Sequence, residues 1–499
     1  MTSDIPTTTR APTAIPAAIA AALSDEGLAW LTAVLSLQDD ALAAALERIA
    51  VLEAENQQLR AMAGKDSSNS SKPPSSDPPG AKAVRRRQAH RKPSGKKAGA
   101  QFGHVGKARA LRPVEEADRI VPHFPAACGH CGADLAGARE RSRPLPHQQY
   151  ELPPLKLELV HHWLHRLLCP RCGAETTAEL GAEDRTGQGP RLTAFIALLG
   201  VRYRQSRMLV RDLVKDLFDL SISAGTVQAC WERTAAALVD PINAIEQTLQ
   251  KAKVGYFDET GWKQWGKKCW LWVVTTTVCT WFMVHPRRNA EALDKLFPDG
   301  FEGTVHSDRW VVYTALFDAT HRQLCWSHLG RDLQEIIDAK GAAATRTEEV
   351  RVGKAAMFHA WHAFKAGQMD RAALKGATAS FRLNFRSFCK DGAAQEADAL
   401  WRKLGASLIE LWPAVFRFLD VDGVEPTNNH AERAIRPGVI LRKLSGGTRS
   451  DVGSACVSRM LSVAATCRQQ NIDVLDYLAE TLTCFWRGIP PPRLIRARD

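Results

Sequence analysis

Apolar residues near the N-terminus recur with a period of seven. Two such series lie between positions 35 and 60, formed by Leu35, Leu42, Ile49 and Asn56 and by Ala45, Leu52 and Leu59. This spacing predicts a helical N-terminal region, residues 1–64, whose apolar seam forms a coiled coil in a homo-oligomer, with Asn56 fixing the register. Because the pattern covers only about three or four heptads, an amphipathic helix that folds back onto its own domain is the alternative.

The periodic pattern is lost in residues 65–113. Residues 65–79 are rich in Ser and Pro and cannot bury enough apolar surface to fold, so we expect a disordered linker. Residues 82–112 carry eleven Lys or Arg and no acid, which predicts a basic arm that follows DNA phosphates; a solvated tail is the alternative. The basic residues that we expect to contact DNA are Arg85, Arg86, Arg87, Arg91, Lys92, Lys96 and Lys97.

Two C-x-x-C-G motifs lie in residues 114–185. Cys128 and Cys131 form the first pair, and Cys169 and Cys172 form the second. Two such knuckles can supply four thiolates to one structural Zn²⁺, so we expect a zinc ribbon, with a redox role for either pair as the rival. The gap between the pairs is longer than is usual, and we expect strands in the segment YELPPLKLELVHHWLHRLLC to fill it.

Helical periodicity returns in residues 186–250. The segments MLVRDLVKDLF and AGTVQACWERTAAAL read as two helices, and Ser223 stands where an N-cap would open the second. Two short helices joined by a tight turn are typical of a helix-turn-helix that binds DNA. Simple packing of a helical hairpin is the alternative interpretation.

Residues 251–330 change to a pattern of strands. Three β-rich runs are followed by a helix and a fourth strand, which is the order of a ribonuclease H-like α/β fold. Asp258 falls in the first strand and Asp308 at the end of the fourth. Because the first and fourth strands are neighbours in such a sheet, we expect the two carboxylates to converge. An Asp at a strand end that serves only as a turn residue is the alternative.

A third acid lies in the segment TNNHAERAIRP. Asn428, Asn429 and Glu432 would share one face of a helix that Pro437 limits at its C-terminal end. Three carboxylates can hold two divalent cations, Mg²⁺ or Mn²⁺, for phosphodiester chemistry. The side chains that we expect to hold DNA beside them are Asn428, Asn429, Arg433, Arg436, Arg442 and Lys443. An exposed Glu432 paired with Arg436 is the alternative.

Charge and composition favour a polyanionic partner. The 499 residues carry a formal net charge of +12 and a pI near 9.2, so nucleic acid is the leading candidate. Neither a signal peptide nor an apolar run of about 18 residues is visible, and we expect a cytoplasmic protein without membrane contact. The twelve cysteines read as reduced thiols in a chain of this length.

Several motifs together resemble one family. SSNSSKPPSSD, RKPSGKKAGAQFGH, the two cysteine knuckles, DETGW, SDRWVVY, QLCWSHLGRDL and NNHAERAIRPGVILRK occur in this order. The set resembles the insertion sequence 66 family of bacterial transposases, from about residue 66 to the C-terminus.

The resemblance implies a DDE transposase that cuts and joins DNA at transposon ends and in target DNA. Its triad maps onto Asp258, Asp308 and Glu432, and other proteins of the same element are expected partners. It also implies a helical insertion, here residues 331–424, within a catalytic domain of residues 251–330 and 425–470; a C-terminal tail, residues 471–499, follows. Cys325 and His328 recur in the family, and we expect them to pack at a strand end, with half a metal site as the alternative.

These patterns predict a multidomain α+β chain with a coiled coil, a zinc ribbon, a helix-turn-helix-like region and a ribonuclease H-like catalytic domain. An active transposase needs all three acids, and the sequence has them. A catalytically inactive or co-opted DNA-binding protein derived from a transposase would keep the same DNA-binding parts. The sequence leaves this second function open.

Overall fold

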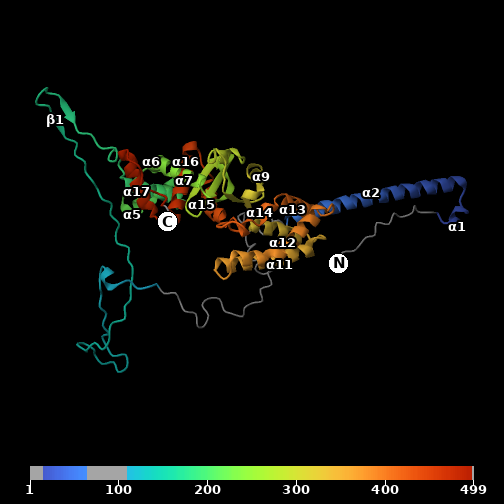
Figure 1. Cartoon of the computed structure of the whole chain (residues 1–499), viewed down its shortest axis with the longest axis horizontal. Coiled ribbons are helices and arrows are strands. Elements are labelled where there is room, and N and C mark those ends of the chain that lie inside the picture. Colours follow the sequence, from blue (N-terminus) through green and yellow to red (C-terminus); the bar gives the residue numbers. More distant parts are fainter. Residues whose placement is uncertain (1–14, 64–108, 497–499) are drawn as a thin grey trace. The chain divides into compact units, whose positions relative to one another are not determined.

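The structure is a computed structural model that describes residues 15–63 and 109–496 (Figure 1). The described residues fall into two units. Residues 15–63, 245–262 and 267–439 belong to the first unit, and residues 109–244, 263–266 and 440–496 belong to the second. Within the described residues, no helix is long and apolar enough to cross a membrane.

A five-stranded sheet organises the first unit. Its strands are β3 (Val254–Gln264), β4 (Lys267–Thr275), β5 (Thr280–His285), β6 (Thr304–Ser307) and β7 (Arg322–Leu324). The order across the sheet is β5-β4-β3-β6-β7, and β6 pairs in parallel with both β3 and β7. The first and fourth strands are therefore neighbours, as the sequence predicted.

Aromatic residues pack against the sheet around Phe257 of β3, the residue before Asp258. The ring of Phe257 contacts those of Phe297, Phe301, Tyr313 and Phe317. Tyr313 lies on α9 (Val311–Leu316), and the connection from β5 to β6 contains only the short helix α8 (Glu291–Asp294). This aromatic core fixes the backbone on either side of Asp258 and Asp308.

The region after β7 is helical in the first unit. It contains α10 (Trp326–Asp338), α11 (Ala344–Lys365), α12 (Arg371–Ala393), α13 (Ala399–Glu410) and α14 (Trp412–Val415), with 3₁₀ turns at Ala319–His321 and Arg417–Leu419. Trp326, Phe385 and Phe416 lie at the centre of their shared core. This packing anchors the first turn of α10 directly beside the end of β7.

The helix that carries Glu432 continues past Pro437, where the sequence predicted its end. Helix α15 runs from Asn429 to Ser445 with Pro437 inside it, so the prediction that Pro437 ends the helix was wrong. Proline removes one backbone donor but does not stop a helix whose apolar face is packed, and Ile435 and Leu441 are buried on either side of it. Arg442 and Lys443 therefore lie on the last turn of the helix that carries Glu432 on its first.

Helices make up the ordered core of the second unit. They are α4 (Pro190–Val201), α5 (Arg207–Phe218), α6 (Ala224–Ala237), α16 (Asp451–Gln469) and α17 (Val474–Arg487), while α7 (Val239–Gln250) leads toward the sheet. The hydroxyl of Ser223 accepts from the N–H of Thr226 at 3.0 Å, which confirms the predicted cap. A Cβ at Gly200 would lie 1.8 Å from the Trp231 ring, so glycine lets α4 and α6 pack closely.

The C-terminal residues form part of this helical core. Val474, Tyr477, Leu478 and Leu482 of α17 are buried, and α17 packs against α4 and α6. The prediction of a tail over residues 471–499 is thus corrected for residues 474–487. The apolar stripe of α17 recurs with helical spacing, which could have revealed the helix from the sequence.

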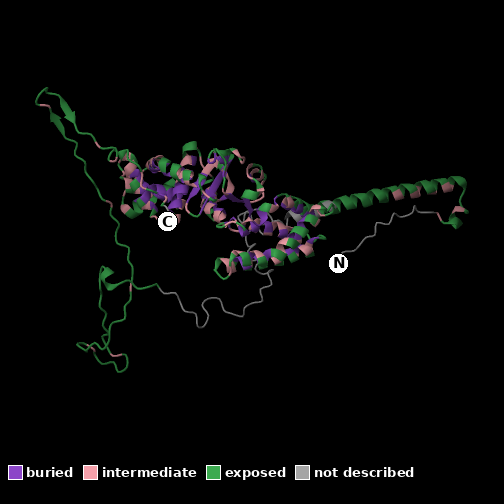
Figure 2. Cartoon of the chain, viewed as in Figure 1, coloured by how far each residue is buried: buried purple, intermediate pink, exposed green. Residues whose placement is uncertain are grey.

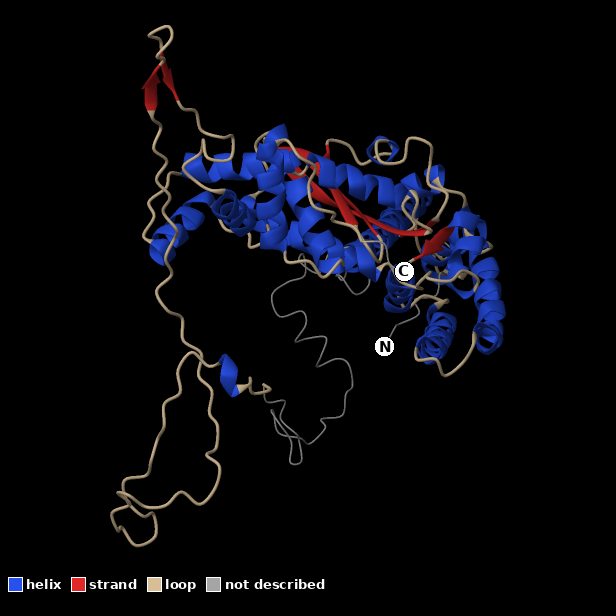
Figure 3. Cartoon of the chain, turned by 60° about the vertical axis from the view of Figure 1, so that its left-hand side comes forward, coloured by secondary structure: helices blue, strands red, loops and turns tan. Residues whose placement is uncertain are grey.

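Residues 114–185 contain little regular structure. The elements are a 3₁₀ turn at Val114–Glu116 and the hairpin of β1 (Arg166–Leu168) and β2 (Glu175–Thr177). The strands predicted for residues 150–165 are absent there. Pro153 and Pro154 lack backbone donors, and the segment has no partner strand, so its apolar side chains are exposed (Figures 2 and 3).

The N-terminal heptads lie on one long helix. After α1 (Ala17–Ala20), helix α2 extends from Asp25 to Ala63. Leu42, Ile49 and Leu52 of the predicted seam are exposed along it (Figure 2). The helix is confirmed, while the coiled coil stays a prediction.

Candidate active site

Two aspartates come from neighbouring parallel strands. Asp258 lies in β3, and Asp308 directly follows β6. The Asp258 carboxylate accepts from the N–H of Glu259 at 2.9 Å, and that of Asp308 accepts from the N–H of Trp310 at 2.9 Å. Burial raises the pKa of Asp258 well above its usual value, and the Glu259 and Asp308 carboxylates raise that pKa further. The structure therefore brings these two acids together, as predicted.

The turn that carries Asp308 is held by a buried cation. Arg322 of β7 donates to the Asp308 carbonyl at 3.0 Å, to Ser307 Oγ at 3.1 Å and to Thr314 Oγ1 at 2.9 Å. Burial lowers the pKa of Arg322 to about 10, so the guanidinium stays charged at neutral pH. These bonds fix the backbone from which the Asp308 side chain projects.

Glu259 is a functional candidate that the sequence interpretation missed. Its carboxylate is buried, and it accepts from Arg288 Nε at 2.9 Å and from the hydroxyl of Tyr313 at 2.5 Å. The Arg288 guanidinium lies 3.9 Å from the centre of the Trp310 ring and 4.8 Å from that of Trp270. A second acid directly after Asp258, in DETGW, was the available signal.

Helix α15 is anchored to the sheet through the residue that precedes it. Asn428 is 2% exposed; its side chain donates to the Phe257 carbonyl at 2.7 Å, and its backbone N–H donates to Cys325 Sγ at 3.1 Å. The amide nitrogen of Asn428 is thus used inside the protein, whereas its Oδ1 has no hydrogen-bond partner among the described residues. That Asn428 contacts DNA stays a prediction. Asn429 is half-buried.

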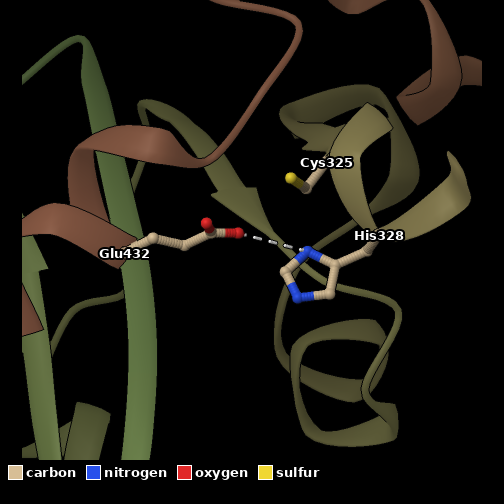
Figure 4. Close-up of side chains that lie close together, drawn as sticks. All are labelled: Cys325, His328 and Glu432. Atoms are coloured by element: carbon tan, nitrogen blue, oxygen red, sulfur yellow. Dashed lines mark ion pairs between the residues drawn. The ribbon is translucent and has the colours of Figure 1, made fainter. Parts of the chain in front are cut away.

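The third predicted acid lies against the Cys325–His328 pair. Oε1 of Glu432 is 3.7 Å from Nδ1 of His328, and ligand atoms of Cys325, His328 and Glu432 all lie within 4.8 Å of one another (Figure 4). Cys325 is buried at the end of β7, and His328 lies one turn on. Across the described ranges this is the one such cluster of three or more potential metal ligands, so Asp258, Asp308 and Glu432 do not form an equally close triad.

Strong electrostatic coupling links the thiol and the imidazole. Burial opposes ionisation of both groups, raising the pKa of the thiol and lowering that of the ring. The His328 ring and the Asn428 N–H outweigh burial, so the net pKa of Cys325 is lowered. Cys325 in turn raises the pKa of His328 to about 9. The thiol and the imidazole therefore influence each other's ionisation, and both lie beside the Glu432 side chain.

The two cysteine knuckles have matching geometry. The N–H of Cys128 donates to the Ala133 carbonyl, and that of Cys169 donates to the carbonyl of Ala174. In each knuckle the glycine after the second cysteine has a positive φ, 74° at Gly132 and 72° at Gly173. Hydrogen bonds within each turn lower the pKa of Cys128 and of Cys169. The two knuckles thus share one backbone geometry, but the structure does not bring the four thiols together.

The predicted DNA contacts divide into two sets. Arg433, Arg436 and Lys443 are exposed on α15, and Arg442 is half-buried. The basic-arm residues lie outside the described residues; they are Arg85, Arg86, Arg87, Arg91, Lys92, Lys96 and Lys97. The α15 residues thus lie on the same helix as Glu432, and their contact with DNA stays a prediction.

Comparison with known proteins matches a family model to the part of the chain that contains the five-stranded sheet. The model of the family described as "Transposase IS66 family" matches residues 188–455, and a family of unknown function matches residues 22–110. Two similar proteins of Sinorhizobium fredii are both described as uncharacterized.

The first relative, y4qI, is 26% identical over 254 residues, which cover 45% of this chain and 45% of its own length. The second, y4jO, is 27% identical over 177 residues, or 35% of this chain and 52% of its own length. The chain thus spans about half the length of each of these relatives.

Proposed function

The chain belongs to the IS66 family of transposases, and from this premise we propose that it cuts and joins DNA at the ends of an insertion sequence. The observation that carries the proposal is the pair Asp258 and Asp308, which project from neighbouring parallel strands of a mixed sheet. A ribonuclease H-like catalytic domain is the fold that we infer for this sheet. Glu432, on the first turn of α15, is the third acid of the proposed site.

The acids fit a divalent metal centre. The raised pKa of Asp258 reflects its burial first and then the nearby Glu259 and Asp308 carboxylates, and an oxygen-rich site of this kind favours Mg²⁺ or Mn²⁺. Glu432 Oε1 is buried and has no hydrogen-bond partner among the described residues, so it is available as a ligand. We infer that Asp258, Asp308 and Glu432 hold two such ions. When bound, the ions activate a water or 3′-hydroxyl and stabilise the leaving oxygen.

The protein's own residues orient this site and its substrate. Arg322 fixes the turn of Asp308, and Asn428 fixes the start of α15. Glu432 must turn from His328 toward the aspartates for the triad to close. The cations at Arg433, Arg436 and Lys443 then lie on the same helix to receive phosphates of the strand being cut.

DNA binding beyond the site is assigned to three parts. The basic arm would supply phosphate contacts, α5 and α6 would act as a helix-turn-helix, and the cysteine knuckles would close around one Zn²⁺. The capped second helix and the matching knuckle turns support these assignments. Other proteins of the same element are proposed as further partners, and the cytoplasm is the proposed compartment.

A homo-oligomer is proposed through α2. Its seam residues Leu42, Ile49 and Leu52 are exposed along a helix of 39 residues, and pairing two seams would remove them from water. Replacing all three with Glu should leave monomers, as measured by light scattering. An unchanged mass would assign assembly to another surface.

The catalytic proposal is tested on DNA that carries the ends of the element. Asp258→Asn, Asp308→Asn and Glu432→Gln should each abolish Mg²⁺- or Mn²⁺-dependent cleavage while DNA binding persists, because each change removes a metal ligand but leaves the phosphate contacts. Asp299→Asn and Glu302→Gln are matched controls at exposed positions of the same unit and should cleave normally. Cleavage by Glu432→Gln at the wild-type rate would overturn the triad, and a wild-type protein that binds but never cleaves would indicate an inactive, DNA-binding descendant.

A further inference from the structure

We propose that Cys325, His328 and Glu432 form a binding site for a zinc-class divalent cation, separate in chemistry from the oxygen-ligated metal centre of the proposed function. A sulfur, a nitrogen and a carboxylate oxygen meet within 4.8 Å. Thiolate and imidazole ligands select zinc-class ions over Mg²⁺. Three protein ligands with an open fourth position are the usual composition of a non-structural zinc site.

The spacing of the ligands matches a shared ion better than a direct bond. His328 Nδ1 and Glu432 Oε1 are 3.7 Å apart, which is too long for a hydrogen bond. Two N or O ligands at about 2.0–2.2 Å from a tetrahedral ion lie about 3.4 Å apart. Both atoms are buried and lack a hydrogen-bond partner within the described part of the chain. An ion between them would satisfy two polar atoms that the protein leaves unsatisfied.

The charges around the cluster also suit a cation. Metal binds the deprotonated thiol and imidazole, so binding an ion would release their protons. Arg331 and Lys354 add positive charge nearby. The thiolate and the carboxylate supply the negative charge that offsets these cations.

The fold both fixes the ligands and leaves an entry route. Cys325 directly follows β7 as the N-cap of α10, and His328 is on the first turn of α10, so two ligands come from one packed junction. The Asn428 N–H bond to Cys325 Sγ ties this junction to the start of α15. The side chains of His328 and Glu432 are 25% and 31% exposed, so an ion can reach them from solvent.

Sharing of Glu432 couples the two centres. A carboxylate held by the zinc-class ion is unavailable to Mg²⁺, so this ion would hold the third acid away from the aspartates. This consequence rests on the proposed function, whereas binding of the ion does not. The two can therefore fail separately.

Cobalt binding tests the site directly and needs no DNA. In the full chain with Cys128, Cys131, Cys169 and Cys172 replaced by Ser, Co²⁺ should bind at about one equivalent and give a sulfur-to-cobalt charge-transfer band. Adding Cys325→Ser should remove the band, and Glu432→Gln should weaken Co²⁺ binding at least about tenfold. Cys269→Ser, at a buried cysteine of β4 outside the cluster, should leave the band unchanged.

Two results would overturn the site. In the first, the four-serine protein keeps its helical circular dichroism but shows no charge-transfer band with Co²⁺. In the second, the band remains after Cys325→Ser is added. If the four-serine protein does not fold, zinc analysis of the otherwise unaltered chain replaces it. There Cys325→Ser should lower the zinc content by about one ion per chain after saturation, and an unchanged content would refute the proposal.

Discussion

Two regions of the molecule position their potential metal ligands differently. One is the sheet of the first unit, with its aspartates, and the other is the cysteine-bearing segment of residues 114–185. Around the sheet, Asp258 and Asp308 project from strands whose neighbours are buried, and packing alone brings them together. In the cysteine segment the backbone turns are formed, yet Leu159 is 81% and Trp163 is 79% exposed. The first region is organised by its apolar core. The second lacks one, and in the proposed function a Zn²⁺ would gather its four thiols.

Zinc should therefore affect the second region most strongly. Structural zinc binding contributes about 10–16 kcal/mol in small zinc domains, the largest effect expected here. Removing it with a chelator should make residues 114–185 sensitive to protease while residues 245–439 stay resistant, and Cys169→Ser with Cys172→Ser should do the same. Mass spectrometry of the fragments would measure this.

The matched control is Cys269→Ser, which should leave both regions as resistant as in the wild type. The claim that zinc organises residues 114–185 would be contradicted if purified protein contained no zinc and all four knuckle thiols were freely alkylated.

A buried ion pair tests whether packing organises the first region. Arg288→Ala leaves the Glu259 carboxylate buried with one fewer partner, which should lower the free energy of unfolding by about 3–5 kcal/mol. Arg287→Ala is the control: its side chain is 72% exposed and pairs with Glu291 at 3.5 Å, so it should cost less than about 1 kcal/mol. Urea unfolding would compare the two variants.

The role of charge in this effect can be separated from lost packing. Adding Glu259→Gln to Arg288→Ala removes the unpaired charge and should recover part of the stability. Equal losses in Arg287→Ala and Arg288→Ala would show that the pair is not the organising contact.

The sequence predicted those features that repeat locally. Strand order followed from alternating apolar runs, and the cap at Ser223 from its place before a helical stripe. Glu432 was found because its spacing from Asn428 and Asn429 is helical. Each of these signals lies within a few residues of the feature that it predicts.

Features set by contacts between distant segments were missed. Cys325 and His328 were expected to pack at a strand end or to form half a metal site, because Glu432 is far away in the sequence and comes close only through α15. The hydrogen bond from Asn428 to the Phe257 carbonyl was missed because the two residues are far apart in the sequence. Pro437 read as a helix end because the packing of α15 around it is also a tertiary effect. Local signals cannot reveal such contacts.

Removing an acid from the metal-free site should stabilise the protein. The folded-state pKa of Asp258 is raised, so the folded form keeps a proton that the unfolded chain loses above about pH 4. Stability therefore falls as pH rises from there through the folded pKa. Asp258→Asn should remove this fall and add about 1–3 kcal/mol at neutral pH, which is within the usual size of single-substitution effects.

The control is Asp299→Asn, at an exposed site, which should change neither stability nor its pH dependence. Thermal unfolding in chelator across pH would decide. A loss of stability in Asp258→Asn would mean that the carboxylate is a structural partner and not one of a group of mutually repelling acids.

The smallest change in stability is expected at the N-cap of α6 in the second unit. This helix is held both by a hydrophobic core and by the hydrogen bond of its cap. Ser223 Oγ accepts from the Thr226 N–H at 3.0 Å, while Val227 and Cys230 of the same helix are buried. Ser223→Ala should cost about 1 kcal/mol and leave α6 folded, because core packing and not the cap holds the helix. Ser223→Asp keeps an acceptor and adds a favourable charge at the helix N-terminus, so it should restore stability. Urea unfolding and circular dichroism would follow both variants. If Ser223→Ala instead unfolded α6, this helix would depend on one local bond, and the contrast between packed and ligand-organised regions would not hold for the second unit.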